Sequence, residues 1–214
     1  MPLANWIAFV IAGSLIAISP GSGAVLSMSH GLAYGLRKAS ATVAGLQCGL
    51  LLVFAIAGAG VGSLLLASEL AFNIVKTLGA LYLIFLGVQQ WRAPVVAGAG
   101  RADAPVAAHP AWQKRFLTGF LTNATNPKGI IFMVAVLPTF ISNTLPLLPQ
   151  LAILGATMVT IDTIVMHGYA FLASSMQQYF RDAGALRKQN RFFGAVLACI
   201  GGALFFVKRG GHPA

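Results

Sequence analysis

The chain has 214 residues and a formal net charge of +10, and 57% of its residues are hydrophobic while only 8% are charged. Soluble domains carry about 25% charged residues, so this composition, with a mean hydropathy of +0.82, excludes an ordinary water-soluble core. The basic residues stand in short segments between apolar runs rather than along one face, which favours a membrane protein and argues against a nucleic-acid partner.

Six apolar runs separated by polar breaks predict an all-α integral membrane protein with six transmembrane helices. In chain order the runs lie near Trp6–Ser29, Ala39–Leu66, Leu70–Trp91, Phe116–Ile141, Leu148–Ala173 and Phe192–Val207. Two charge-free stretches, Ala39–Ser68 with 30 residues and Gly129–Ile161 with 33, exceed the roughly 20 residues that cross a bilayer core. The first run lacks a basic start and a cleavage site, so we expect it to be retained rather than removed as a signal peptide.

Residues 92–115 separate three predicted spans from three others. This segment is rich in Ala, Gly and Pro with scattered charges, which is typical of a flexible linker. We therefore expect residues 1–91 and 116–214 to form two three-helix repeats. A repeat with an odd number of spans returns in the opposite orientation, so the repeats are expected to be inverted.

The distribution of Lys and Arg predicts the orientation in the membrane. The connections after spans 1, 3 and 5 carry Arg37, Lys38, Arg92, Arg101, Lys114, Arg115, Arg181, Arg187, Lys188 and Arg191. The opposite side carries only Lys208 and Arg209 in the tail. The linker is therefore expected in the cytoplasm, and both termini are expected in the periplasm.

Two predicted spans are interrupted near the middle of the bilayer. Span 1 contains Ser19, Pro20, Gly21, Ser22 and Gly23, and span 4 contains Asn126, Pro127 and Lys128. In each break a residue favoured as a helix N-cap directly precedes a proline, which is favoured as the first helical residue. The pattern predicts that helices 1 and 4 are broken and restart at these prolines.

Helix starts inside a membrane offer free N–H groups to an anion, and the carbonyls before them accept an ammonium group or a cation. These residues are therefore our candidate substrate-binding site, suited to a zwitterionic amino acid. The alternative is that the two prolines merely kink the bundle, since Pro and Gly are tolerated in membrane helices.

Asp162 is the one carboxylate inside a predicted span, about 14 residues or roughly 20 Å from its start. A carboxylate at that depth is costly unless it is paired, hydrated or protonated, so Asp162 is a candidate proton carrier. Lys128 lies at a similar depth and is a candidate partner of Asp162 or of a substrate carboxylate. His167 is a candidate proton relay, although a lone His on a helix is more often structural.

The chain contains no Walker loop, no H-E-x-x-H pair and no Ser/His/Asp constellation in a polar context. The sequence therefore gives no support for an enzyme, for ATP-driven transport or for a bound cofactor or metal.

Several motifs together resemble the lysine exporter superfamily of amino-acid exporters. They are S-P-G-S-G at Ser19–Gly23, G-L-Q-C-G at Gly45–Gly49, G-A-L-Y-L-I-F-L-G at Gly79–Gly87 and L-T-N-A-T-N-P-K at Leu121–Lys128. The segment Ile161–Ala170 is most similar to the branch that exports homoserine and homoserine lactone. The resemblance implies a secondary exporter in the bacterial inner membrane, driven by the proton motive force, with a small neutral amino acid or derivative as substrate and a homodimer as the assembly.

Two other functions compete with this one. Export of a divalent or heavy-metal cation would need several metal ligands at one depth, and Asp162 has only His167 close by in the sequence. A membrane scaffold would use the intramembrane charges to hold helices together, but it would need no matching breaks in both halves.

Overall fold

The computed structural model describes residues 1–66, 69–92, 110–142, 144–175 and 183–206. Within these ranges the secondary structure is entirely helical. The elements are α1 (Leu3–Ile18), α2 (Ser22–Tyr34), α3 (Leu36–Leu66), α4 (Glu69–Trp91), α5 (Trp112–Ala124), α6 (Pro127–Val136), the short 3-10 helix η1 (Leu137–Phe140), α7 (Leu147–Ser175) and α8 (Ala183–Leu204).

Two of the predicted spans are bent pairs of helices. α1 and α2 meet at 55°, and α5 meets the segment Pro127–Phe140 at 48°. Two unbroken segments, Leu36–Gly60 and Leu147–Ser175, are long and apolar enough to cross a membrane, and each bent pair qualifies if it is one span. The described residues thus contain two to four candidate spans by length and composition.

The remaining predicted runs also form helices. The third run forms α4, whose apolar part, Lys76–Gln89, is shorter than a full span. The sixth run begins within α8 but extends past its end, because α8 ends at Leu204; Val207, the last residue of the predicted run, lies outside the described residues. Residues 93–109 of the predicted linker also lie outside them. The last residues of the predicted linker, 112–115, are helical instead, since α5 begins at Trp112 rather than at Phe116.

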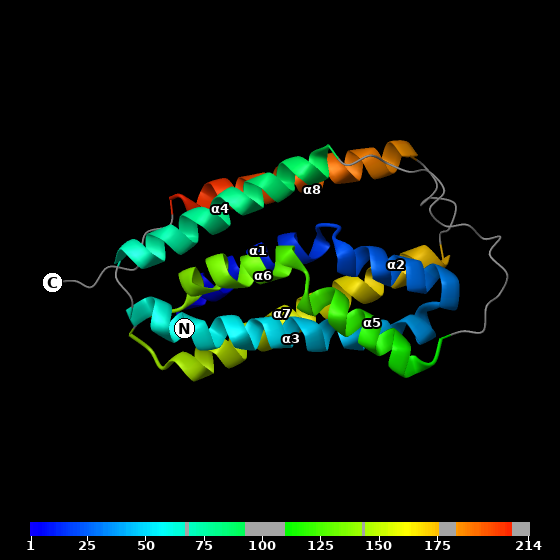
Figure 1. Cartoon of the computed structure of the whole chain (residues 1–214), viewed down its shortest axis with the longest axis horizontal. Coiled ribbons are helices and arrows are strands. Elements are labelled where there is room, and N and C mark those ends of the chain that lie inside the picture. The colour runs from blue at the N-terminus through cyan, green and yellow to red at the C-terminus, as the bar shows by residue number, and fades with distance from the viewer. Residues whose placement is uncertain (67–68, 93–109, 143, 176–182, 207–214) are drawn as a thin grey trace.

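The helices pack in pairs that connect the two sides of the linker. α3 packs on α5, α2 on α7 and α4 on α8, and Figure 1 shows α4 and α8 side by side along one edge of the molecule. Glycines allow the close approach. A Cβ at Gly45 would collide with the carbonyl oxygen of Phe116, and one at Gly87 would lie 2.5 Å from the carbonyl oxygen of Gly194. Small residues at such crossings are typical of helix packing in membranes.

The centre of the molecule is an apolar cluster contributed mainly by α1, α3, α6 and α7. Phe9, Phe132, Met133 and Leu154 are fully buried in it. Because the broken helices lie against α3 and α7, both breaks face the same interior (Figure 1). The inverted relation between the two halves stays a prediction.

Candidate functional site

The first break separates α1 from α2 at residues 19–21. The N–H of Ser19 donates to the carbonyl of Leu15 at 3.1 Å, so Ser19 completes α1. The prediction that Ser19 is an N-cap and Pro20 the first helical residue is therefore wrong. Residues before a proline avoid the helical region, and Ser19 is extended with φ −64° and ψ 119°. Gly21 is the N-cap instead, and α2 begins at Ser22.

The second break is built as the sequence predicts. Asn126 is the N-cap of α6, its side chain accepts the N–H of Lys128 at 3.1 Å, and Pro127 lies in the first turn. The amide of Asn123 donates to the carbonyl of Leu46 at 2.8 Å and so ties this break to α3. The N-terminus of α6 is thereby held next to the middle of α3.

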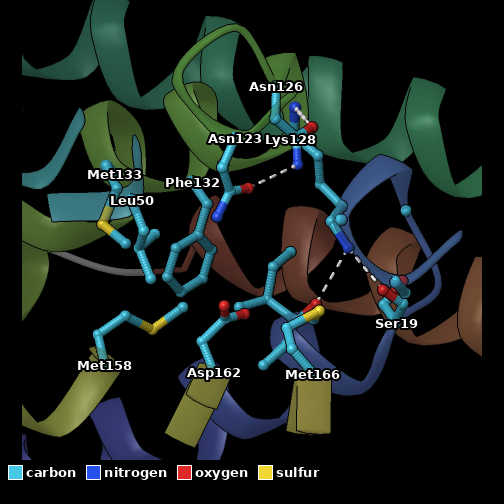
Figure 2. A pocket seen from close by; sticks show the side chains of 16 residues that line it. Ser19, Leu50, Asn123, Asn126, Lys128, Phe132, Met133, Met158, Asp162 and Met166 are labelled. Atoms are coloured by element: carbon cyan, nitrogen blue, oxygen red, sulfur yellow. Dashed lines mark hydrogen bonds between the residues drawn. The ribbon is translucent and has the colours of Figure 1, made fainter. Parts of the chain in front are cut away.

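A cavity of about 40 Å³ lies between the two breaks. Its polar lining consists of Ser19, Asn123, Asn126, Lys128 and Asp162, and its apolar lining includes Leu50, Phe132, Met133, Met158 and Met166 (Figure 2). The backbone of Gly21 and Gly23, at the start of α2, completes one side. The space holds a few water molecules but not an amino acid, so the site is closed in this conformation.

Lys128 reaches from α6 across the cavity to the end of α1. Its Nζ donates to the carbonyl of Ile16 at 3.1 Å and to that of Ser19 at 2.6 Å (Figure 2). The carbonyls at the end of a helix have no partner within the helix and need one from elsewhere. The hydroxyl of Tyr169 likewise donates a hydrogen bond to the carbonyl of Ile18, at 2.5 Å. Side chains from the second half of the chain therefore donate hydrogen bonds to the carbonyls at the break in the first half.

Asp162 is only 6% exposed and projects from α7 into the cavity between Met158 and Met166 (Figure 2). Its Oδ2 accepts a hydrogen bond from Nε2 of Gln47 at 2.8 Å. The direct pair of Lys128 with Asp162 that equal depth suggested is not formed, because Lys128 bonds the carbonyls of α1 and Asp162 bonds Gln47. The sequence reading missed Gln47, although an amide inside a long apolar run is itself a signal of a buried polar contact.

The other candidate residues lie around the cavity rather than in its lining. Pro20, Ser22 and Pro127 belong to the breaks, but they do not line the cavity, and Ser22 is exposed. His167 lies outside it, with Nδ1 2.9 Å from the carbonyl of Thr163 and Nε2 3.3 Å from the hydroxyl of Ser40. Across the described ranges, no group of three or more His, Cys, Asp or Glu side chains gathers as a metal site.

The cavity combines one cation, one carboxylate, amide groups and a largely apolar wall that includes three methionines. These groups complement a small zwitterion with a modest side chain, since each charge of such a ligand finds its opposite within one cavity. Methionine side chains adapt their shape readily, which suits a pocket that accepts related ligands.

Comparisons with known proteins give a consistent result. Residues 14–208 match the family model described as LysE type translocator. The homoserine/homoserine lactone efflux protein of Salmonella typhi is 40% identical over 200 residues, which cover 93% of this chain and 95% of the relative. An uncharacterized membrane protein of Vibrio cholerae is 39% identical over 204 residues, covering 94% of this chain and 96% of the relative.

A more distant relative is the leucine efflux protein of Klebsiella pneumoniae, which is 32% identical over 137 residues and covers 64% of this chain and 63% of that protein. No solved structure matches the chain. The family resemblance in the sequence motifs is confirmed by the match to the family model.

Proposed function

The chain belongs to the LysE type translocator family, and we propose that it is a secondary exporter of small neutral amino acids or their derivatives. Homoserine, homoserine lactone and threonine-like compounds are the proposed substrates. The protein crosses the bacterial inner membrane six times in this proposal, as two inverted repeats of three spans.

The observation that carries the proposal is the cavity between the two helix breaks. The starts of α2 and α6 line it together with Lys128 and Asp162. A substrate carboxylate fits the cationic side of the cavity, where Lys128 and the helix starts lie, because helix N-termini carry partial positive charge. The similar relatives named for homoserine and leucine efflux support the same class of substrate.

Asp162 is the proposed proton carrier. It lines the cavity, so it meets both the substrate and any water that enters when the cavity opens to one side. Import of one proton on this carboxyl as substrate leaves the cell would give antiport driven by the proton gradient. His167 is proposed as a relay toward the cytoplasm, since it lies beyond Asp162 on α7.

Counterflow in liposomes tests the transport function. We expect purified protein in vesicles loaded with unlabelled homoserine to take up labelled homoserine and threonine faster than protein-free vesicles, and to take up labelled lysine poorly. Homoserine lactone is tested in the same way. A failure to move any of these solutes would leave the scaffold function as the better account.

Reporter fusions test the topology. Because Lys and Arg concentrate in the connections assigned to the cytoplasm, alkaline phosphatase fused after Ala214 should be active, and a fluorescent protein inserted near Gly100 should fluoresce. Phosphatase activity at Gly100 together with fluorescence at Ala214 would show that the orientation is inverted.

A further inference from the structure

We infer that the carbonyls of Ile16 and Ser19 form the subsite for the ammonium group of the substrate, and that Lys128 fills this subsite when no substrate is bound. The inference rests on the proposed function, because it names where one charged group of an exported amino acid binds. It makes the cationic side chain of Lys128 an internal competitor for the substrate.

The subsite exists because α1 ends inside the molecule. The carbonyls of its last turn lie beyond the last helical N–H groups, and Pro20, four residues after Ile16, has no N–H to donate to the carbonyl of Ile16. Two of these oxygens converge on one cation, at 3.1 Å from Ile16 and 2.6 Å from Ser19. The ion they hold is a primary ammonium, which is also the charged group on the amine of homoserine and threonine.

The surroundings of Lys128 are shaped to hold its side chain over this position. Gly21 has no side chain, and a Cβ there would lie 3.1 Å from Nζ and 3.2 Å from Cε of Lys128. With the lysine in place, only about 40 Å³ of the cavity remains free. A bound amino acid therefore requires Lys128 to withdraw.

Withdrawal of Lys128 provides both halves of a zwitterion site. The vacated carbonyls receive the substrate ammonium, with the carboxylate of Asp162 in the same cavity. The lysine has a long flexible stem, so its freed ammonium group is available for the substrate carboxylate. One substrate thus inserts its two charges between Lys128 and the end of α1.

This arrangement predicts how small probes bind. A ligand with an ammonium group must displace Lys128, so its apparent affinity is reduced by the fraction of molecules in which the subsite is free. Removing the lysine should remove that penalty. n-Propylammonium carries N–H groups that can donate to the two carbonyls. Tetramethylammonium has the same charge but no N–H to donate, so comparing the two separates hydrogen bonding from charge.

The experiment is isothermal titration calorimetry on the purified full-length protein in nanodiscs. We expect Lys128→Met to bind n-propylammonium at least about tenfold more tightly than the wild type. Its affinity for tetramethylammonium should rise much less. Lys114→Met removes an equal charge from an exposed position on α5 and should bind both probes as the wild type does. If Lys128→Met does not fold, Lys128→Gln serves for the same comparison.

Three results would overturn the inference. The first is that Lys128→Met binds n-propylammonium no more tightly than the wild type. The second is that its affinity rises equally for both probes, which would indicate an effect of charge alone. The third is that Lys114→Met shows the same rise in affinity. The proposed function is tested separately by homoserine counterflow with the wild type. If the wild type shows counterflow but Lys128→Met binds n-propylammonium no more tightly, the proposed transport function is supported and the proposed subsite is wrong. If Lys128→Met binds more tightly but the wild type shows no counterflow, the subsite is supported and the proposed transport function is wrong.

Discussion

Asp162→Asn is expected to abolish uphill export while it leaves exchange of substrate across the membrane largely intact. The substituted amide has the shape of the carboxyl and still offers an oxygen to Nε2 of Gln47, which bonds Asp162 at 2.8 Å. Folding and the form of the cavity should therefore persist. An amide cannot carry a proton through the transport cycle, so the link between substrate movement and the proton gradient is lost.

Vesicles with an imposed pH gradient measure the effect directly. The wild type should concentrate homoserine against its gradient, whereas Asp162→Asn should reach only the external concentration and should not respond to pH. Asp162→Glu, which keeps an ionisable carboxyl, should retain part of the driven uptake. If the Asn variant concentrates substrate as the wild type does, Asp162 is a structural partner of Gln47, and the coupling group lies elsewhere.

The positions of the helices could be predicted from the sequence because apolar runs and polar breaks report them directly. The runs proposed for spans 2 and 5 correspond closely to α3 and α7. The bends at 19–21 and 125–126 follow from local chemistry, since proline cannot continue a helix. How helices pair cannot be read in this way, because contacts such as that of Gly45 with Phe116 depend on how each helix is rotated.

The two breaks differ in how well the local pattern predicted them. At Asn126 the side chain forms the expected cap, because the following proline and lysine take up helical geometry at once. At Ser19 the same pattern is overridden, because Ser19 is the C-cap of α1 and α2 begins only at Ser22, with Gly21 as its N-cap. A capping residue that closely follows one helix can finish that helix rather than begin the next.

Depth along the helices placed Lys128 and Asp162 at one level, and both line the same cavity. Depth could not predict their partners. The lysine side chain is long enough to reach several acceptors, and the carbonyls at the end of α1 can accept its hydrogen bonds only because the helix breaks there. Gln47 was missed because an amide in an apolar run indicates a buried polar contact but does not identify the residue that it contacts.

The last expected result concerns the cavity as the path of the substrate. Gly23 lines it, and a Cβ at this position would lie 3.4 Å from Leu46 Cδ2, 3.7 Å from Met166 Sδ and 3.8 Å from Asn123 Oδ1. These are ordinary contacts, so alanine fits. Alanine also favours a helix over glycine by roughly 1 kcal/mol at most. The Gly23→Ala protein should therefore be at least as stable as the wild type.

Its transport should nevertheless fall, because the added methyl group lies beside Asn123 and Met166 and takes space from the substrate. One extra methylene-sized group in a fitted pocket changes discrimination by about tenfold or more, so we expect a loss of that size in homoserine counterflow. Gly23→Leu should abolish counterflow altogether, including the exchange that survives in Asp162→Asn.

Gly168 provides the matched control. It lies on α7 outside the cavity lining, and a Cβ there meets nothing within 4 Å. Gly168→Ala and Gly168→Leu should transport as the wild type does, with melting temperatures measured for all four variants to verify folding. Wild-type counterflow in folded Gly23→Leu would mean that substrate does not pass this point, because a leucine side chain between Asn123 and Met166 leaves too little room for an amino acid.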